Sequence, residues 1–188
     1  MKRSDVNYLI RQATACFTAN GWALPPSPRW DVTDFGLGDW SKFGLVLVNL
    51  ADEPEYCEKV MYVRRGMVTP AHTHAIKKED IICRWGVLTV KVWKGKPDVF
   101  RPDDFTIKVN GETQRIFGGD SITLNAGERV TLVPGIYHQF ESISEECIVG
   151  EVSTANDDAT DNFFADPEVG RFSEIIEDAP RGVLLIHE

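Results

Sequence analysis

Near its start the chain carries apolar residues at the spacing of one helical face. These positions recur every three or four residues and are Val6, Leu9, Ile10, Ala13, Cys16 and Phe17. Ser4 precedes most of them as a suitable N-cap, and Asn20-Gly21 follows them as a typical C-terminal stop. The pattern predicts one helix between these signals. The next segment, 23–29, contains three prolines and is expected to be irregular.

From about Phe43 onward the pattern changes to short apolar runs separated by glycine and proline. Such runs predict strands, which we expect at 45–50, 59–64, 80–85, 87–93, 105–109, 113–117, 121–124, 129–133, 138–143 and 147–153. Asn110-Gly111 predicts a tight hairpin turn, because both residues accept positive φ angles. Segment 183–186 is a candidate for one last strand. Many short strands at this spacing are typical of an all-β sandwich or barrel.

The composition is that of a single folded domain. The chain has 188 residues, of which 43% are hydrophobic, and no uncharged apolar run approaches the roughly 20 residues that span a bilayer. The net charge is −9, and residues 141–188 hold 13 acidic residues against Arg171 and Arg181. This balance argues against nucleic acid or an anionic membrane as a partner, since both attract clustered positive charge.

The four cysteines have none of the short spacings of a zinc knuckle or a redox dithiol. The first residues also lack the pattern of a secretory signal. We therefore expect reduced thiols, mostly packed as small hydrophobic side chains, in a cytoplasmic protein.

Three of the four histidines lie where they could bind one metal ion. His72 and His74 are two residues apart, so on a strand both side chains project to the same face. Glu79 follows closely, and His138 lies after a Pro134-Gly135 turn. Three imidazoles and a carboxylate form a mixed set that suits manganese, ferrous iron, cobalt, nickel or zinc and leaves coordination positions open. An isolated His-x-His pair is also compatible with two ordinary strand residues.

The spacing around the histidines resembles the two motifs of the cupin superfamily. The first is Gly66, five residues, His72-Thr73-His74, four residues, Glu79, six residues and Gly86. The second is carried by Gly127, Gly135 and His138, with Pro134 displaced by one position. The resemblance implies an antiparallel jelly-roll barrel, with His72, His74, Glu79 and His138 pointing into its mouth as metal ligands. On this basis residues 1–42 are a helix and an irregular crossing packed on the barrel, and 43–188 are the cupin barrel with an acidic C-terminal segment, all within one domain.

Further segments look like the D-lyxose isomerase family of cupins. They are 56–59, 68–74, 77–82, 150–153, 156–158 and 160–162. This resemblance implies a manganese-dependent, homodimeric aldose–ketose isomerase that interconverts D-lyxose and D-xylulose, and often D-mannose and D-fructose. Ala75 stands where the family pattern has a bulky aromatic residue, and Phe163 stands where a polar or basic residue is expected. Both departures bear on the substrate more than on the reaction type.

Two charged residues on predicted strands are candidates for catalysis. Glu151 lies among Ile148, Val149 and Val152, where a charge without a purpose would be costly, so it is the candidate base. The alternative is an ordinary glutamate on the outer face of the sheet. Lys59 interrupts an apolar strand and could polarise or protonate a substrate oxygen.

On a strand, the side chain of Lys59 lies on the same face as those of Met61 and Val63. The alternative for Lys59 is a partner for Glu58 or a surface lysine. Lys77, Asp158 and Asp161 are candidate sugar contacts, or belong to a charged loop.

The sequence is also compatible with other functions. The same ligand set can hold ferrous iron in a cupin dioxygenase, since ligand type barely separates iron from manganese. A non-catalytic cupin that binds metal or sugar is a further alternative, and sugar-phosphate isomerase or epimerase chemistry is another.

Overall fold

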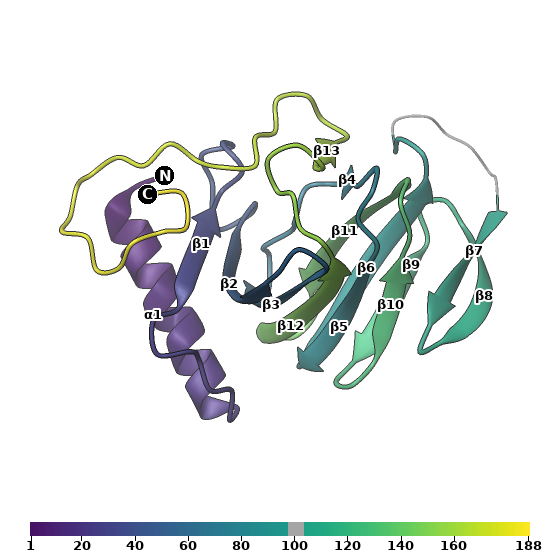
Figure 1. The fold of residues 1–188 in the computed structure, drawn as a ribbon, viewed down its shortest axis with the longest axis horizontal. Coiled ribbons are helices and arrows are strands. Elements are labelled where there is room, and N and C mark those ends of the chain that lie inside the picture. The colour runs from purple at the N-terminus through teal and green to yellow at the C-terminus, as the bar shows by residue number, and fades with distance from the viewer. Residues whose placement is uncertain (98–103) are drawn as a thin grey trace.

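A computed structural model describes residues 1–97 and 104–188 of the chain. Within this part the chain forms one helix and thirteen strands (Figure 1). These elements are α1 (Arg3–Ala19), β1 (Arg29–Thr33), β2 (Leu45–Asp52), β3 (Tyr56–Arg64), β4 (His72–Thr73), β5 (Glu79–Trp85), β6 (Val87–Lys94), β7 (Asp104–Val109), β8 (Glu112–Phe117), β9 (Ser121–Asn125), β10 (Arg129–Leu132), β11 (Ile136–Ser142), β12 (Glu146–Thr154) and β13 (Phe163–Phe164).

The strands form two antiparallel sheets. The larger sheet has the order β1-β2-β3-β12-β5-β10-β7-β8, and the smaller has the order β13-β4-β11-β6-β9. Their inner faces share one buried apolar core, with Leu47, Met61 and Ile81 from the larger sheet and Val90 and Phe140 from the smaller. The sheets are not joined into a closed barrel, but their arrangement is that of a jelly roll. The predicted all-β class with an N-terminal helix is confirmed.

Helix α1 covers the outer face of the larger sheet. Its apolar stripe packs as predicted, with Leu9 and Phe17 fully buried in a second core that includes Trp30, Val48 and Tyr62. As a result β3 and β12 are buried on both faces along most of their length, and β2 is buried along its first half. A polar side chain on the inner face of these strands is therefore shielded from water on every side except the mouth of the jelly roll.

Strand alternation directs two charged side chains into that interior. On β3, Lys59 has the parity of Met61, which lies in the core between the sheets, whereas Tyr62 faces the helix. On β12, Glu151 has the parity of Val149, which lies in the same inner core. Lys59 and Glu151 are both buried, so the outer-face alternative for Glu151 is wrong.

The chain ends pack together beside the start of α1 (Figure 1). Lys2 forms an isolated bridge with Ile176, and the fully buried Arg3 makes ion pairs with Glu177 and Glu188. The segment after β13 therefore crosses the molecule from the smaller sheet to the helix.

Two local predictions are wrong. The helix begins at Arg3 rather than after Ser4, and the Ser4 hydroxyl instead donates to the Asp178 carboxylate at 2.7 Å. Segment 183–186 does not form a strand: Leu185 makes a single bridge to Trp30, and the Glu188 amide then donates to the Leu185 carbonyl and turns the chain away.

The other predicted strands are present, with ends that differ by a few residues, and the Asn110-Gly111 turn has φ angles of 54° and 86°. Three strands were not predicted. Strand β1 follows the three prolines directly and pairs with β2, with Thr33 opposite Leu45. Strands β4 and β13 have two residues each, too few to show a periodic pattern.

All four cysteines are buried and unpaired, as predicted from their spacing. Among the described residues, none of the helical segments is long and apolar enough to span a bilayer.

Leu9→Ala tests whether α1 is held by its apolar stripe. Leu9 is fully buried, so the substitution should lower the free energy of unfolding by about 2 to 5 kcal/mol. Chemical denaturation followed by circular dichroism measures this change. Thr18→Ala, at an exposed position of the same helix, is the control and should be nearly neutral. An unchanged denaturation midpoint in Leu9→Ala would show that the helix is dispensable to the sheet.

Candidate active site

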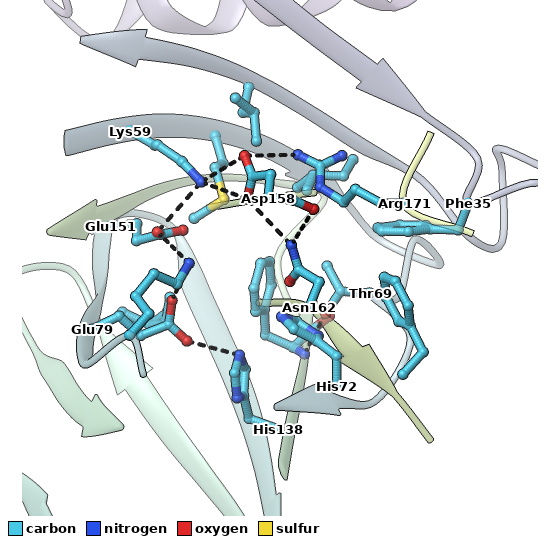
Figure 2. Close-up of a pocket in the computed structure, with 17 residues that line it drawn as sticks. Phe35, Lys59, Thr69, His72, Glu79, His138, Glu151, Asp158, Asn162 and Arg171 are labelled. Carbon is cyan, nitrogen blue, oxygen red and sulfur yellow. Dashed lines mark hydrogen bonds and ion pairs between the residues drawn. The ribbon is translucent and has the colours of Figure 1, made fainter. Parts of the chain in front are cut away.

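A cavity opens between the inner faces of the two sheets (Figure 2). Apolar residues of the core form much of its wall, and charged and polar residues gather around them. The lining residues are Phe35, Leu45, Leu47, Lys59, Met61, Thr69, His72, Lys77, Glu79, Ile81, His138, Phe140, Glu151, Asp158, Asn162, Phe164 and Arg171. Of the nine site residues predicted from the sequence, seven line this cavity.

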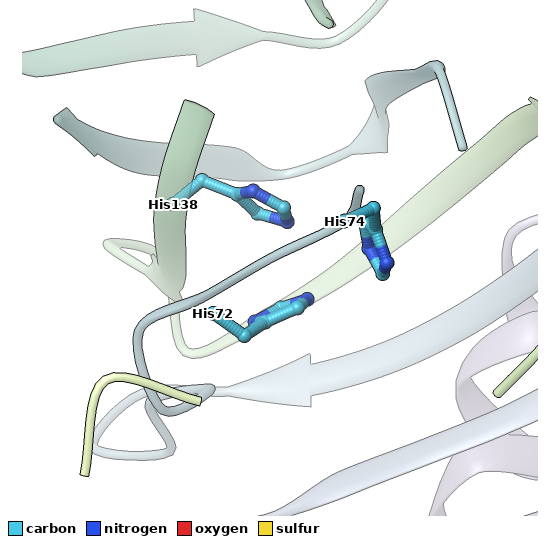
Figure 3. Close-up of side chains that lie close together, drawn as sticks. All are labelled: His72, His74 and His138. Carbon is cyan, nitrogen blue, oxygen red and sulfur yellow. The ribbon is translucent and has the colours of Figure 1, made fainter. Parts of the chain in front are cut away.

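Three of the predicted metal ligands form one cluster (Figure 3). His72 on β4 lies directly opposite His138 on β11, and His74 follows β4. The ring centroid of His72 lies 4.2 Å from that of His138 and 5.3 Å from that of His74. One ligand atom from each histidine lies within 4.8 Å of the other two. The cluster is compatible with a divalent metal site.

Backbone carbonyls fix the orientation of all three rings. The Nδ1 atom of His72 lies 2.9 Å from the Pro70 carbonyl, and Nδ1 of His138 lies 3.3 Å from the Ile136 carbonyl. The Nδ1 atom of His74 is in close contact with the Asp161 carbonyl. A carbonyl only accepts, so each Nδ1 donates a proton, and Nε2 is the ring atom left to bind a metal. This is the tautomer that binds a metal through Nε2.

The carboxylate of Glu79 faces these lone pairs. Its Oε1 atom lies 3.0 Å from Nε2 of His138 and 3.5 Å from Nε2 of His74. Both Oε1 of Glu79 and Nε2 of His74 are buried without a hydrogen-bond partner. Acceptor atoms this close repel one another unless a positive charge lies between them, and atoms bound to one cation at about 2.1 Å stand about 3 Å apart. The four predicted ligands therefore fit a divalent cation.

The protonation states agree with such a site. Burial, followed by the neighbouring His138 and His74, holds the pKa of His72 well below its ordinary value, so this ring is neutral. Burial alone would raise the pKa of Glu79, but Lys77 and His138 hold it well below its ordinary value. Neutral imidazoles and an ionised carboxylate are the forms in which these groups bind metals.

Lys77 connects the histidine cluster to Glu151. Its Nζ lies 3.0 Å from Oε2 of Glu79 and 3.0 Å from Oε1 of Glu151. Burial alone would lower the pKa of Lys77, but Glu151 and Glu79 raise it above its ordinary value, so the ammonium stays charged. Lys77, Glu79 and Glu151 are each at most 6% exposed, and their charges can be buried only because they are paired.

The same charge pattern continues through Lys59 to the far end of the cavity. Lys59 Nζ lies 3.6 Å from Glu151 and 3.2 Å from Asp158. Asp158 in turn lies 3.6 Å from Arg171, which also pairs with the buried Asp31 behind it. Lys59 is 2% exposed, so it is neither a surface lysine nor a partner of Glu58.

Asp161 differs from the other predicted site residues. Its carboxylate accepts hydrogen bonds from the backbone amides of Ala75, Ile76 and Lys77, so its oxygens are occupied by the backbone rather than offered to a sugar. The two departures from the family pattern, Ala75 and Phe163, have exposed side chains.

Arg171 and Asn162 line the cavity but were not predicted as site residues. Arg171 had one usable signal, because it is one of only two basic residues in the acidic stretch 141–188. Asn162 had none beyond its place in a segment that resembles the family.

Comparisons with known proteins place the chain among sugar isomerases. A family model described as D-lyxose isomerase matches residues 27–188. A D-lyxose/D-mannose isomerase of Escherichia coli O157:H7 is 34% identical over an alignment that covers 100% of this chain and 98% of the relative. The corresponding enzyme of Serratia proteamaculans is 36% identical, with 100% and 97% covered. A D-lyxose ketol-isomerase of Cohnella laeviribosi is 33% identical, with 85% and 89% covered.

Solved structures share the fold. The L-ribose isomerase of Cellulomonas parahominis with L-ribose has a TM-score of 0.69 and 18% identity, and the match covers 94% of this chain and 98% of that one. The L-ribose isomerase of Acinetobacter sp. DL28 in complex with L-ribose has a TM-score of 0.68, also at 18% identity.

The fold and the cavity together define a cupin-type jelly roll with a three-histidine, one-carboxylate cluster in its mouth. Within that class, the chain belongs to the D-lyxose isomerase family.

Asp158→Asn tests the buried charge network. Although burial raises the pKa of Asp158, Lys59 and Arg171 hold it far below its ordinary value. The ionised group therefore stabilises the fold above its unfolded pKa of about 3.9, and this contribution is lost as the pH falls through the lower folded value. The difference in free energy of unfolding between wild type and Asp158→Asn should be largest near neutral pH and shrink below about pH 4. Urea denaturation at several pH values measures it; a difference that does not vary with pH would contradict the assignment.

Proposed function

We propose that the protein is a metal-dependent aldose–ketose isomerase that interconverts D-lyxose and D-xylulose, with D-mannose and D-fructose as a second pair. The family and the names of its relatives support the reaction and the sugars. The observation that carries the proposal is the position of Glu151. Lys77 bridges Glu151 and Glu79, which faces the histidine cluster, and both glutamates line the same buried cavity.

In this proposal His72, His74, Glu79 and His138 hold the metal, and the metal is Mn²⁺. The chain supplies three nitrogens and one carboxylate, and a sugar would add hydroxyl and carbonyl oxygens, which Mn²⁺ accepts well. When bound, the ion supplies a Lewis acid that stabilises negative charge on the oxygens of the reacting carbon atoms.

Isomerisation of an aldose to a ketose moves one proton between C2 and C1 and another between O1 and O2. Glu151 is the proposed base for the carbon-bound proton. Its Oε1 is held by Lys77 at 3.0 Å and by Lys59 at 3.6 Å, and these contacts fix the carboxylate where it lines the cavity. A proton taken from C2 by Glu151 can be returned to C1 of the resulting enediol, so no other carbon acid or base is required.

Lys59 is the proposed partner for the substrate oxygens. Its buried ammonium donates to Asn156 at 2.9 Å and to Asp158 at 3.2 Å, and would exchange one of these bonds for an oxygen on which negative charge develops. Lys77 lines the cavity next to the metal ligands and is a second proposed donor to the sugar. The two lysines lie on opposite sides of Glu151 in the chain of ion pairs.

The far end of the cavity is the proposed site for the remaining sugar hydroxyls. Asp158, Asn162 and Arg171 present both donors and acceptors there. The Nη1 atom of Arg171 is buried without a hydrogen-bond partner, and a sugar hydroxyl would satisfy it. Asp161 is left out of this group, since its carboxylate is bound to the backbone.

For the setting of the enzyme we propose a cytoplasmic homodimer that binds neither nucleic acid nor membrane. The excess of acidic residues and the four unpaired thiols support this. The dimer rests on family resemblance.

Glu151→Gln tests the proposed base. The variant keeps the shape of the side chain but cannot accept the carbon-bound proton, so we expect manganese binding to be unchanged and turnover to fall by a hundredfold or more, on the order of the usual contribution of a general base. D-Lyxose and D-mannose are incubated with manganese-loaded protein in D₂O, and ketose formation is measured together with deuterium entry at C1 of the ketose and at C2 of the recovered aldose.

His138→Ala is the complementary variant. It removes a proposed ligand and should lower both bound manganese, measured by elemental analysis, and turnover. The proposal fails if wild-type protein loaded with manganese leaves all four sugars unchanged, and Glu151 loses its role if the Gln variant turns over normally.

A further inference from the structure

Asp161 contacts the site from outside the cavity. It lies in the loop 155–162 between β12 and β13 and is 6% exposed. Its Oδ1 accepts from the amide of Ala75 at 2.7 Å, and its Oδ2 accepts from the amide of Lys77 at 2.9 Å. The amide of Ile76 between them lies 3.2 Å from Oδ1. One carboxylate thus binds three consecutive backbone amides, the arrangement of an anion-binding nest.

The backbone of the same residue holds a ring of the histidine cluster. The Asp161 carbonyl accepts the Nδ1 proton of His74, which fixes the ring and leaves its Nε2 toward Glu79. Asp161 therefore contacts both sides of the short segment 74–77, its side chain on the amides and its carbonyl on the ring.

Besides Asp161, the backbone of this segment is held by the Gly135 amide, which donates to the His74 carbonyl at 2.8 Å. The segment connects β4 to β5 outside both sheets, and Ala75 and Ile76 have exposed side chains, Ile76 at 81%. Yet it carries His74 at one end and the buried Lys77 at the other, and Lys77 spans Glu79 and Glu151 at 3.0 Å each. A small change in the backbone here would move both groups at once.

We propose that Asp161 is a positioning residue that sets the orientation of His74 and the reach of Lys77 through one shared anchor. The expected effect on isomerisation rests on the function proposed above. The expected effects on the His74 ring and on the backbone of segment 74–77 do not depend on that function. In this role Asp161 touches neither metal nor sugar, and it links the 155–162 loop, which also supplies Asp158 and Asn162 to the cavity, to the histidine cluster.

Asp161→Asn tests the proposal, because it replaces one acceptor oxygen by an NH₂ group that faces amide donors. We expect manganese affinity, measured by calorimetry, to fall tenfold to a hundredfold, the usual effect of losing a residue that supports a metal ligand. In kinetics, kcat should fall more than KM changes. The unfolding midpoint is measured alongside, to separate positioning from general stability.

Asp157→Asn is the matched control. Asp157 lies in the same loop, and its carboxylate also accepts from backbone amides, those of Ala159 and Thr160, but it is exposed and does not line the cavity. This variant should leave manganese affinity and kinetics within twofold of wild type. Equal losses in the two variants would show that the loop acts only through stability and would overturn the proposal.

Hydrogen exchange on the unsubstituted protein keeps the test valid if Asp161→Asn does not fold. The amides of Ala75, Ile76 and Lys77 should be protected although two of these residues are on the surface, and the Nδ1 proton of His74 should be observable by NMR. Where Asp161→Asn does fold, these amides should exchange at least tenfold faster. Unprotected amides in wild type, or an Asn variant with unchanged manganese affinity, would refute the anchor. Neither result depends on isomerase activity, so a failure of the proposed reaction is distinguishable.

Discussion

The structure depends on one electrostatic constraint: the Nε2 atoms of buried histidines and a carboxylate oxygen are held close together inside an apolar jelly roll. Backbone carbonyls accept the Nδ1 protons, so the Nε2 atoms of His74 and His138 are turned toward Oε1 of Glu79, at 3.5 Å and 3.0 Å. That arrangement is unfavourable alone and favourable around a divalent cation. The proposed metal site and its chemistry follow from it.

The remaining charges of the cavity are buried in strict alternation. From the cluster outward they run Glu79, Lys77, Glu151, Lys59, Asp158 and Arg171, with each cation between two carboxylates once Asp31 is included behind Arg171. Pairing of this kind offsets the cost of desolvation, but removal of any member leaves a neighbour uncompensated. It also fixes the position of Glu151 between two ammonium groups, as a base that acts on carbon requires. A cavity built this way is organised before the substrate arrives.

Sequence patterns predicted the features that depend on neighbouring residues. They did not predict the contacts between residues that are far apart in the chain. Period-two alternation placed Lys59 with Met61 on the inner face, and the spacing of His72, His74, Glu79 and His138 predicted the cluster, since both are properties of neighbouring residues. Arg171 and Asp31 are 140 residues apart, and Asp161 is more than 80 residues from the amides it binds. No local pattern encodes such contacts, which is why Arg171 was not predicted and why Asp161 was expected to bind sugar. Strand β1 was missed for a related reason: its five residues are defined by pairing with β2 rather than by their own periodicity.

The central claim is that four side chains share one cation. The most direct test is anomalous X-ray diffraction at the manganese edge from crystals of the protein grown with Mn²⁺. The account predicts a single strong anomalous peak bound at about 2.2 Å by Nε2 of His72, His74 and His138 and by a carboxylate oxygen of Glu79. No peak there at saturating manganese, or a peak coordinated by other residues, would contradict it.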